Sequence, residues 1–178
     1  MNPLSTLPPP LSGSYWVIPG QFLAGEHPAA YGESAIPRRV QELLRSGISV
    51  FYDLTEPRIS DRHYESILYQ QAAEFDLGVR YFNFPIEDFT APSVETVRTI
   101  LDSIDQNIKE GRSIYVHCFA GIGRTGTIVG CYLARHGTTG QAVLHQIAQL
   151  RSQLPSWYRQ SPEAPDQIDL VKSWKAGT

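Results

Sequence analysis

Cysteine is scarce in this chain of 178 residues, which contains only two cysteines alongside five histidines. A closed structural metal site needs four Cys or His ligands at close spacing, and the histidines here are scattered without such partners. The sequence therefore predicts no metal site. With so few thiols, it also favours a reducing location such as the cytoplasm over an oxidising one.

Positive charge and long apolar runs are lacking as well. Lys and Arg number 15 against 18 Asp and Glu, a net charge of −3, whereas a general nucleic-acid binder carries a basic surplus. No apolar run approaches the ~20 residues of a membrane span. The opening residues, MNPLSTLPPP, have neither a basic region nor a long apolar core, so no secretory signal is expected. These absences predict neither nucleic-acid nor membrane partners.

The composition that remains is typical of one globular domain. Hydrophobic residues make up 42% of the chain and charged residues 19%, and a chain of this length can bury a core of useful size. Residues 1–14, rich in Pro and Ser, are expected to form a flexible leader. Residues 15–178 are expected to form a single domain that acts as a monomer.

Strand-like and helix-like segments alternate along the chain. Short apolar runs typical of buried strands occur at 48–54, 79–84 and 113–117. Helices are expected from Pro37 to Gly47, over 60–77, after the N-cap residue Ser93, and near 124–136, 139–152 and 165–175. This alternation predicts an α/β three-layer sandwich, with a mostly parallel central sheet of about four to five strands flanked by helices.

The most informative run extends from His117 to Gly126 and reads HCFAGIGRTG. It lies between a strand-like and a helix-like segment, a layout that points backbone N–H groups and a helix N-terminus at an anion. Cys118 adds a thiol, and the same donors favour its nucleophilic thiolate form. Arg124 offers a planar pair of donors that matches two phosphate oxygens. The run therefore predicts an anion-binding loop with a covalent catalyst in it.

Neighbouring residues have supporting roles in this interpretation. Gly121 and Gly123 let the backbone turn inward without Cβ clashes. The Thr125 hydroxyl can donate to the sulfur and stabilise the thiolate as a leaving group, and His117 can hold the loop through a backbone hydrogen bond. The alternative is a glycine-rich turn around an inert buried Cys, but a structural Cys needs neither the Arg nor the glycines.

The run resembles the signature His-Cys-x-x-Gly-x-x-Arg-Ser/Thr-Gly of the cysteine-based protein tyrosine phosphatases, and the short chain resembles their dual-specificity branch. The resemblance implies a phosphotyrosine protein phosphatase-like fold and a hydrolase that needs no cofactor. Cys118 would form a phosphocysteine, and Arg124 would stabilise the transition state. The substrate phosphate would be bound by Phe119, Ala120, Gly121, Ile122, Gly123 and Arg124.

The family mechanism also needs a general acid on a separate, upstream loop. Residues 81–92, YFNFPIEDFTAP, form an apolar strand that leads into a Pro-bounded loop with two carboxylates. Asp88 precedes Cys118 by 118 − 88 = 30 positions, and Pro-Ile-x-Asp-x-x-x-Pro resembles the dual-specificity acid loop. Asp88 is the candidate acid and Glu87 the weaker alternative. The remaining possibility is that both are solvated loop carboxylates.

Three further residues have open interpretations. Gln167 follows a Pro-containing segment, and some branches of the superfamily use such a Gln to position the water that hydrolyses phosphocysteine. Alternatively, Gln167 faces solvent. Asp53 ends a strand-like run, so it either supports the site or caps the next segment. His27 is interpreted as structural. Cys131 should lie on the order of 10 Å from Cys118, too far for a disulfide, because their Cα atoms would have to approach within ~7 Å.

Together these features predict a phosphoric monoester hydrolase that dephosphorylates proteins or phosphopeptides at phosphotyrosine, and also at phosphoserine or phosphothreonine. The interior of the loop carries no Lys or His, which favours phosphoproteins over polyanionic substrates, although Arg58, Arg62 or Arg159 can supply basic groups. Three alternatives stay open. They are an inositol phosphate or phosphoinositide phosphatase of the same superfamily, another Cys-x5-Arg enzyme such as an arsenate reductase or sulfurtransferase, and a catalytically silent phosphoprotein-binding module.

Overall fold

The computed structural model describes residues 7–57 and 61–178, without the side chains of Asp61 and Arg62. Arg58 and the Arg62 side chain, two of the basic groups considered above, therefore lie outside the described residues. Residues 1–6 of the expected leader do so as well.

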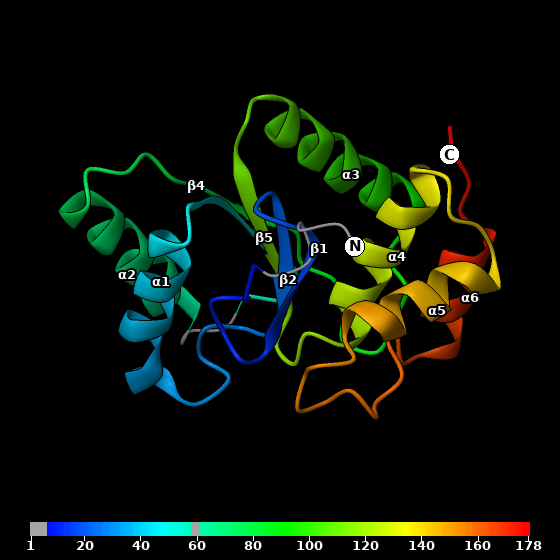
Figure 1. The fold of residues 1–178 in the computed structure, drawn as a ribbon, viewed down its shortest axis with the longest axis horizontal. Coiled ribbons are helices and arrows are strands. Elements are labelled where there is room, and N and C mark those ends of the chain that lie inside the picture. Colours follow the sequence, from blue (N-terminus) through cyan, green and yellow to red (C-terminus); the bar gives the residue numbers. More distant parts are fainter. Residues whose placement is uncertain (1–6, 58–60) are drawn as a thin grey trace.

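A five-stranded sheet forms the centre of the molecule (Figure 1), in the order β1-β2-β5-β3-β4. The strands are β1 Ser14–Ile18, β2 Phe22–Gly25, β3 Ile48–Asp53, β4 Arg80–Asn83 and β5 Ser113–His117. The pair β1 and β2 is antiparallel, and the other neighbours are parallel. The prediction of a mostly parallel sheet is confirmed.

Helices cover both faces of the sheet, as Figure 1 shows. They are α1 Ile36–Arg45, preceded by a 3-10 turn Glu33–Ala35, α2 Asp61–Glu74, α3 Val94–Lys109, α4 Gly123–Arg135, α5 Gln141–Leu150 and α6 Pro165–Ser173. Successive residues of β3 point to opposite faces. Phe51 accordingly packs in a cluster with residues of α1 and α2, and Tyr52 in a cluster with residues of α3 to α6. These two cores confirm the three-layer sandwich.

Local signals place several helix ends where the sequence predicts them. Ser93 caps α3, its side chain accepting a hydrogen bond from Thr96 N, and Gly47 follows α1 with φ 89°. The predicted helix over 60–77 is too long, because α2 ends at Glu74. Asp76 takes the left-handed conformation there, with φ 54°, and Leu77 N donates to the Ala72 carbonyl, as in a Schellman motif.

The packed domain begins earlier than residue 15. Leu11 is buried in the core on the α1 and α2 side of the sheet, and its carbonyl accepts a hydrogen bond from the Ser14 hydroxyl at 2.8 Å. Ser14 is already the first residue of β1. The described part of segment 1–14 is thus not a free leader, because an apolar side chain anchors it. No helix within the described ranges is long and apolar enough to cross a membrane.

The sheet register brings the predicted site residues to one edge. Asp53 of β3 pairs with His117 of β5, which in turn pairs with Gly25 of β2. All three strands are parallel and end at this point, so the segments that follow them emerge side by side. The loop that begins at Cys118 follows the central strand of the three.

Candidate active site

Cys118 begins the loop, residues 118–122, that connects β5 to α4; this segment is called the Cys loop. Its thiol is buried, and its backbone N–H donates to Thr125 Oγ1 at 2.8 Å. The Thr125 hydroxyl in turn donates to the Gly25 carbonyl at 3.4 Å. The Thr125 proton therefore points to a carbonyl of the neighbouring strand, which differs from the predicted donation to sulfur. Thr125 ties both ends of the loop to β2.

Close packing explains two glycines of this run. Gly121 has φ 70°, and a Cβ placed there would lie 2.5 Å from the Gly25 carbonyl carbon. A Cβ on Gly126, in the first turn of α4, would lie 2.1 Å from Ser161 Oγ. That hydroxyl donates to the Ile122 carbonyl at 2.7 Å. Backbone contacts on two sides thus hold the loop, and side chains at these positions would displace it.

Arg124 and Asp88 meet although they lie on different loops. The Arg124 guanidinium is buried, and its Nη2 lies 3.1 Å from Asp88 Oδ1. Its Nη1 donates to the Ile86 carbonyl at 3.0 Å. Its Nε is buried and has no hydrogen-bond partner among the described residues, so it remains available to an anion. The two predicted residues are therefore in direct contact, and Arg124 supplies the hydrogen-bond donors.

Residues 84–92, called the acid loop, present the Asp88 carboxylate. Phe84 N and Ile86 N donate to the carbonyls of Asp53 and Leu54, continuing the sheet pattern beyond β4. A turn follows, closed by the Thr90 N–H donating to the Glu87 carbonyl at 3.3 Å. The Asp88 side chain is 47% exposed and can reach both solvent and Arg124. Glu87 is also exposed, and the ion pair with Arg124 distinguishes Asp88 from it.

Gln167, in the first turn of α6, also lies beside the acid loop and the start of α4. The residue is fully buried, which excludes the solvent-facing alternative. Its Nε2 donates to the Thr90 carbonyl at 3.0 Å, and its Oε1 accepts from Ala164 N at 3.2 Å. A Cβ on Gly123 would lie 3.1 Å from Oε1. The amide therefore touches both the acid loop and the start of α4.

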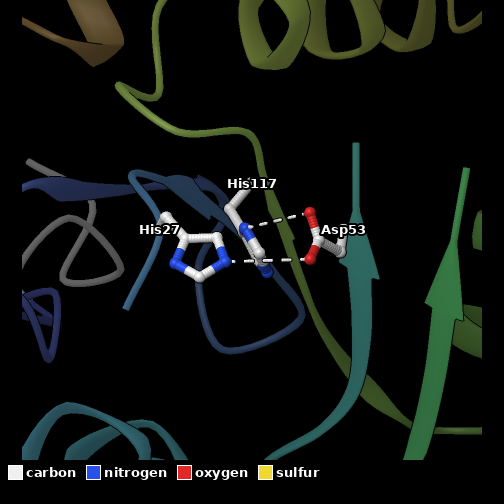
Figure 2. A group of neighbouring side chains, drawn as sticks. All are labelled: His27, Asp53 and His117. Atoms are coloured by element: carbon white, nitrogen blue, oxygen red, sulfur yellow. Dashed lines mark ion pairs between the residues drawn. The ribbon is translucent and has the colours of Figure 1, made fainter. Parts of the chain in front are cut away.

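A cluster of two histidines and a carboxylate lies beneath the Cys loop, with His27 and His117 facing the two oxygens of Asp53 (Figure 2). His27 Nε2 is 3.8 Å from Asp53 Oδ2, and His117 Nδ1 is 3.9 Å from Oδ1. Thr55 N and Oγ1 donate to Oδ1, and the Tyr81 hydroxyl donates to Oδ2. Asp53 therefore caps the segment that follows β3 through Thr55, one of the two alternatives considered, and it also faces His117, the residue before Cys118.

Ionisation in this cluster is shifted by burial and by the neighbouring charges. Burial opposes the charge on Asp53, but the two imidazoles and the Thr55 hydrogen bond outweigh it and hold the pKa of Asp53 well below its ordinary value. Burial lowers the pKa of His117 to about 4, against the attraction of Asp53. His117 is thus a neutral imidazole near neutral pH. Its Nδ1 lies 3.3 Å from the Cys118 carbonyl, the backbone contact expected of this residue.

The donor set of the cluster resembles a metal site, since ligand atoms of all three residues lie within 4.8 Å of one another. The hydrogen bonds argue against it. His27 Nδ1 accepts from Ala29 N at 2.9 Å, so the proton of a neutral ring is on Nε2, the nitrogen that faces Asp53. A protonated nitrogen cannot ligate a metal. The cluster is therefore an arrangement of two imidazoles around the Asp53 carboxylate, and sequence reasoning missed the part that His27 takes in it.

Cys131 lies inside α4 and is buried away from solvent. Both cysteines are free, as the sequence predicts. Burial raises the pKa of the Cys131 thiol far above its ordinary value, so this thiol is inert. Cys118, by contrast, begins the loop between β5 and α4.

Comparisons with known proteins agree with this geometry. A family model described as "Polymorphic toxin system, DSP-PTPase phosphatase" matches residues 28–138. Mouse dual specificity protein phosphatase CDC14A is 32% identical over 123 residues, which cover 68% of this chain and 19% of that protein. The putative tyrosine phosphatase 067L of Invertebrate iridescent virus 3 is 30% identical over 156 residues, 82% of this chain and 61% of that protein. The chain thus spans about a fifth of the length of the CDC14A relatives.

Solved structures share the fold. The active form of Tk-PTP superposes with a TM-score of 0.68 at 24% identity, covering 93% of this chain and 98% of that one. A kinase associated phosphatase with its catalytic cysteine replaced by serine gives a TM-score of 0.67 at 18% identity, covering 84% of this chain and 83% of that one. The arrangement of sheet and helices is therefore one that phosphatases of this kind adopt.

Proposed function

Because this chain belongs to the DSP-PTPase family of cysteine-based protein phosphatases, we propose that it hydrolyses phosphate monoesters through a phosphocysteine formed on Cys118. One observation carries the proposal: buried Arg124, six positions after Cys118, lies 3.1 Å from the candidate acid Asp88. A cation for the phosphate and an acid for the leaving group thus converge beside a thiol. An inert turn would need neither.

In the first step the Cys118 thiolate attacks phosphorus, an S–P bond forms, and the P–O bond to the leaving group breaks. Asp88, protonated, transfers its proton to the leaving oxygen. Arg124 and the N–H groups of the Cys loop neutralise the phosphoryl charge. The Asp88 carboxylate forms an ion pair with the Arg124 guanidinium. A phosphate dianion would displace it, which frees Asp88 to face the leaving group.

In the second step water attacks the phosphocysteine while Asp88 takes a proton from it, and phosphate leaves as the S–P bond breaks. Gln167 is the candidate that positions this water. Its amide contacts Thr90 of the acid loop and lies beside Gly123, and Nε2 carries a second N–H besides the one donated to Thr90. These contacts support the proposal that Gln167 holds the attacking water between Asp88 and the Cys118 sulfur.

The proposed substrates are phosphoproteins or phosphopeptides, at phosphotyrosine and also at phosphoserine or phosphothreonine. The relatives carry the names dual specificity and tyrosine phosphatase. The Cys loop has no basic side chain, and Arg159, the described basic candidate near it, is paired with Glu163 at 2.9 Å. A polyanionic phosphoinositide would find little compensating charge there. Phe119 and Phe89, both largely exposed on the two loops, offer apolar surface to a peptide.

The proposal extends to a cytoplasmic location and a monomeric enzyme. Cys118 must remain a thiol to act, which a reducing compartment ensures. Arg124 and Asp88 meet within one chain, and Cys118 begins the loop that leads to Arg124, which supports a site that is complete in a monomer.

The direct test is hydrolysis of p-nitrophenyl phosphate in the presence of a metal chelator. The unmodified protein should turn over, and Cys118→Ser should reduce the rate by at least about 10³-fold because oxygen is a far weaker nucleophile here. Cys131→Ala, which removes the inert thiol, is the matched control and should retain activity. Activity that survives Cys118→Ser, or that chelator abolishes, would overturn the proposal.

The substrate class needs a separate comparison. Turnover of a phosphotyrosyl peptide, a phosphoseryl peptide and a phosphoinositide should be measured under one condition, with peptides preferred. A preference for the phosphoinositide would favour the lipid-phosphatase alternative. Binding of all three without turnover would favour the silent binding module.

A further inference from the structure

The first turn of α6 contacts the acid loop through two adjacent side chains. Asp166 Oδ2 accepts from Ala91 N at 2.7 Å, and Gln167 Nε2 donates to the Thr90 carbonyl at 3.0 Å. Both contacts reach across more than seventy positions of sequence. Because both partners are backbone groups, the contacts fix the path of the loop and not one of its side chains.

The helix itself holds these two side chains in position. Asp166 Oδ1 accepts from Gln167 N at 2.9 Å, which leaves Oδ2 directed at Ala91. Gln167 Oε1 accepts from Ala164 N, which leaves Nε2 directed at Thr90. The Asp166 contact joins an anion to an N–H, the stronger class of hydrogen bond. The helix N-terminus also stabilises this anion. The pair, Asp166 with Gln167, is called the α6 latch.

The latch acts directly beside the candidate acid. The turn that carries Asp88 ends at Thr90, and the latch holds its last residue and the next one. On the other side of the turn, Ile86 N donates to the Leu54 carbonyl and Ile86 O accepts from Arg124. Asp88 therefore sits between two anchored points, one on the sheet and one on α6.

The backbone of the turn is strained, which explains why a second anchor, on α6, is needed. Phe89, the residue after Asp88, has φ 58°, a conformation that a bulky side chain adopts only where its surroundings impose it. The Phe89 side chain is 61% exposed, so its own packing does not impose it. The constraint comes from hydrogen bonds within the turn, from Thr90 to the Glu87 carbonyl and from Phe89 N to Asp88 Oδ1, together with the anchors on either side of it.

From these contacts we propose that Asp166 is a positioning residue for the general acid, and that the α6 latch sets where the Asp88 carboxylate lies relative to the leaving group. The inference rests on the proposed phosphatase function. Asp166 touches neither substrate nor sulfur in this account and acts only through the backbone of the acid loop.

A purely structural role of Asp166 at the start of α6 predicts something different. Loss of a helix-terminal anion would lower the stability of the protein, and any effect on rate would be the same for all substrates. Loss of acid positioning would instead depend on the leaving group, since only a poor leaving group needs its oxygen protonated in the transition state.

The test compares Asp166→Ala with Asp169→Ala, a matched removal of an exposed carboxylate from the same helix. The kcat/KM, which reports formation of the phosphocysteine, is measured with p-nitrophenyl phosphate, which has a good leaving group, and with phenyl phosphate, which has a poorer one. Asp166→Ala should lower kcat/KM about tenfold on phenyl phosphate and less than about twofold on p-nitrophenyl phosphate. Asp169→Ala should change both by less than about twofold.

Two further variants keep the inference falsifiable. Asp166→Asn retains one acceptor oxygen, whereas the N–H groups of Ala91 and Gln167 need one each. Its rate on phenyl phosphate should therefore lie between those of the unmodified protein and Asp166→Ala. This variant replaces Asp166→Ala if the alanine variant does not fold. Adding Asp166→Ala to Asp88→Asn should cost little more on phenyl phosphate, because the acid to be positioned is already absent.

Equal losses on both substrates, or additive losses in the double variant, would overturn the latch and leave the phosphatase proposal intact. An unmodified protein that fails to hydrolyse either substrate would overturn the phosphatase proposal itself, and the latch with it.

Discussion

The two loops of the site are held by opposite means. The Cys loop is continuous in sequence with the strand and helix that frame it, its thiol is buried, and Gly121 packs against the backbone of Gly25. The acid loop is exposed, and Arg124 and the first turn of α6 hold it from outside. In the proposed mechanism the nucleophile Cys118 needs a rigid loop that is already shaped for an anion. The proposed acid, Asp88, pairs first with Arg124 and then faces the leaving group, so its loop must allow an exchange of partners.

The sharpest change within the Cys loop is Arg124→Lys, which keeps the positive charge but loses the planar pair of donors. We expect kcat to fall by about 10² to 10³-fold, because one ammonium cannot replace the guanidinium that contacts Ile86, Asp88 and the phosphate. Steady-state hydrolysis of p-nitrophenyl phosphate measures the loss. Arg135→Lys at the other end of α4 is the control. If Arg124→Lys and Arg135→Lys lower kcat equally, the planar pair of donors on Arg124 has no special role.

In the acid loop, Asp88→Asn should have a smaller effect that depends on the substrate. The amide cannot donate the catalytic proton, so kcat/KM, which reports formation of the phosphocysteine, should fall about 10²-fold for phenyl phosphate and only a few fold for p-nitrophenyl phosphate. Glu87→Gln, the neighbouring carboxylate, should leave both rates near the original. A larger loss in Glu87→Gln than in Asp88→Asn would transfer the acid role to Glu87.

The stability of the protein should depend on pH through His117, which lies in the buried cluster next to the Cys loop. Its pKa in the folded protein is about 4, below the ordinary 6.5, so the unfolded chain takes up a proton first as pH falls. The free energy of unfolding should therefore decrease between pH 6.5 and 4 by about 2 to 3 kcal/mol from this group. The groups that face it are Asp53, His27, Tyr64 and Tyr115.

Urea unfolding at several pH values measures this slope. Asp53 contributes in a separate window, since its lowered pKa stabilises the fold above pH 3.8 and this stabilisation is lost only below that value. His117→Gln should flatten the slope between pH 6.5 and 4. His136 is the exposed C-cap residue of α4, and the control variant His136→Gln should leave this slope unchanged. An unchanged slope in His117→Gln would contradict the assignment.

The same contrast explains what could be predicted from the sequence. The Cys loop is one contiguous motif on a strand-to-helix junction, and the strand-like run that ends at Asp53 indicated that this residue could support the site. The α6 latch could not be found this way, because Asp166 and Ala91 are 75 positions apart and a hydrogen bond to a backbone N–H leaves no pattern in either segment.

Two differences have equally local causes. The proton of Thr125 points to the Gly25 carbonyl because β2 runs beside the loop, which spacing within the motif does not reveal. His27 belongs to the cluster under the Cys loop only because β2 ends next to β5, a neighbour relation that chain order does not give. The partners of Thr125 and Asp53 at the end of β2 depend on the order of the strands in the sheet, which the sequence did not reveal.

The most direct test of the central claim is to trap the intermediate. Asp88→Asn with p-nitrophenyl phosphate should form phosphocysteine readily but hydrolyse it slowly, because the base of the second step is missing. After acid quench and trypsin digestion, mass spectrometry should find phosphate on the peptide from Ser113 to Arg124, whose one cysteine is Cys118. Turnover with that peptide unmodified, or with phosphate on another peptide, would contradict the account.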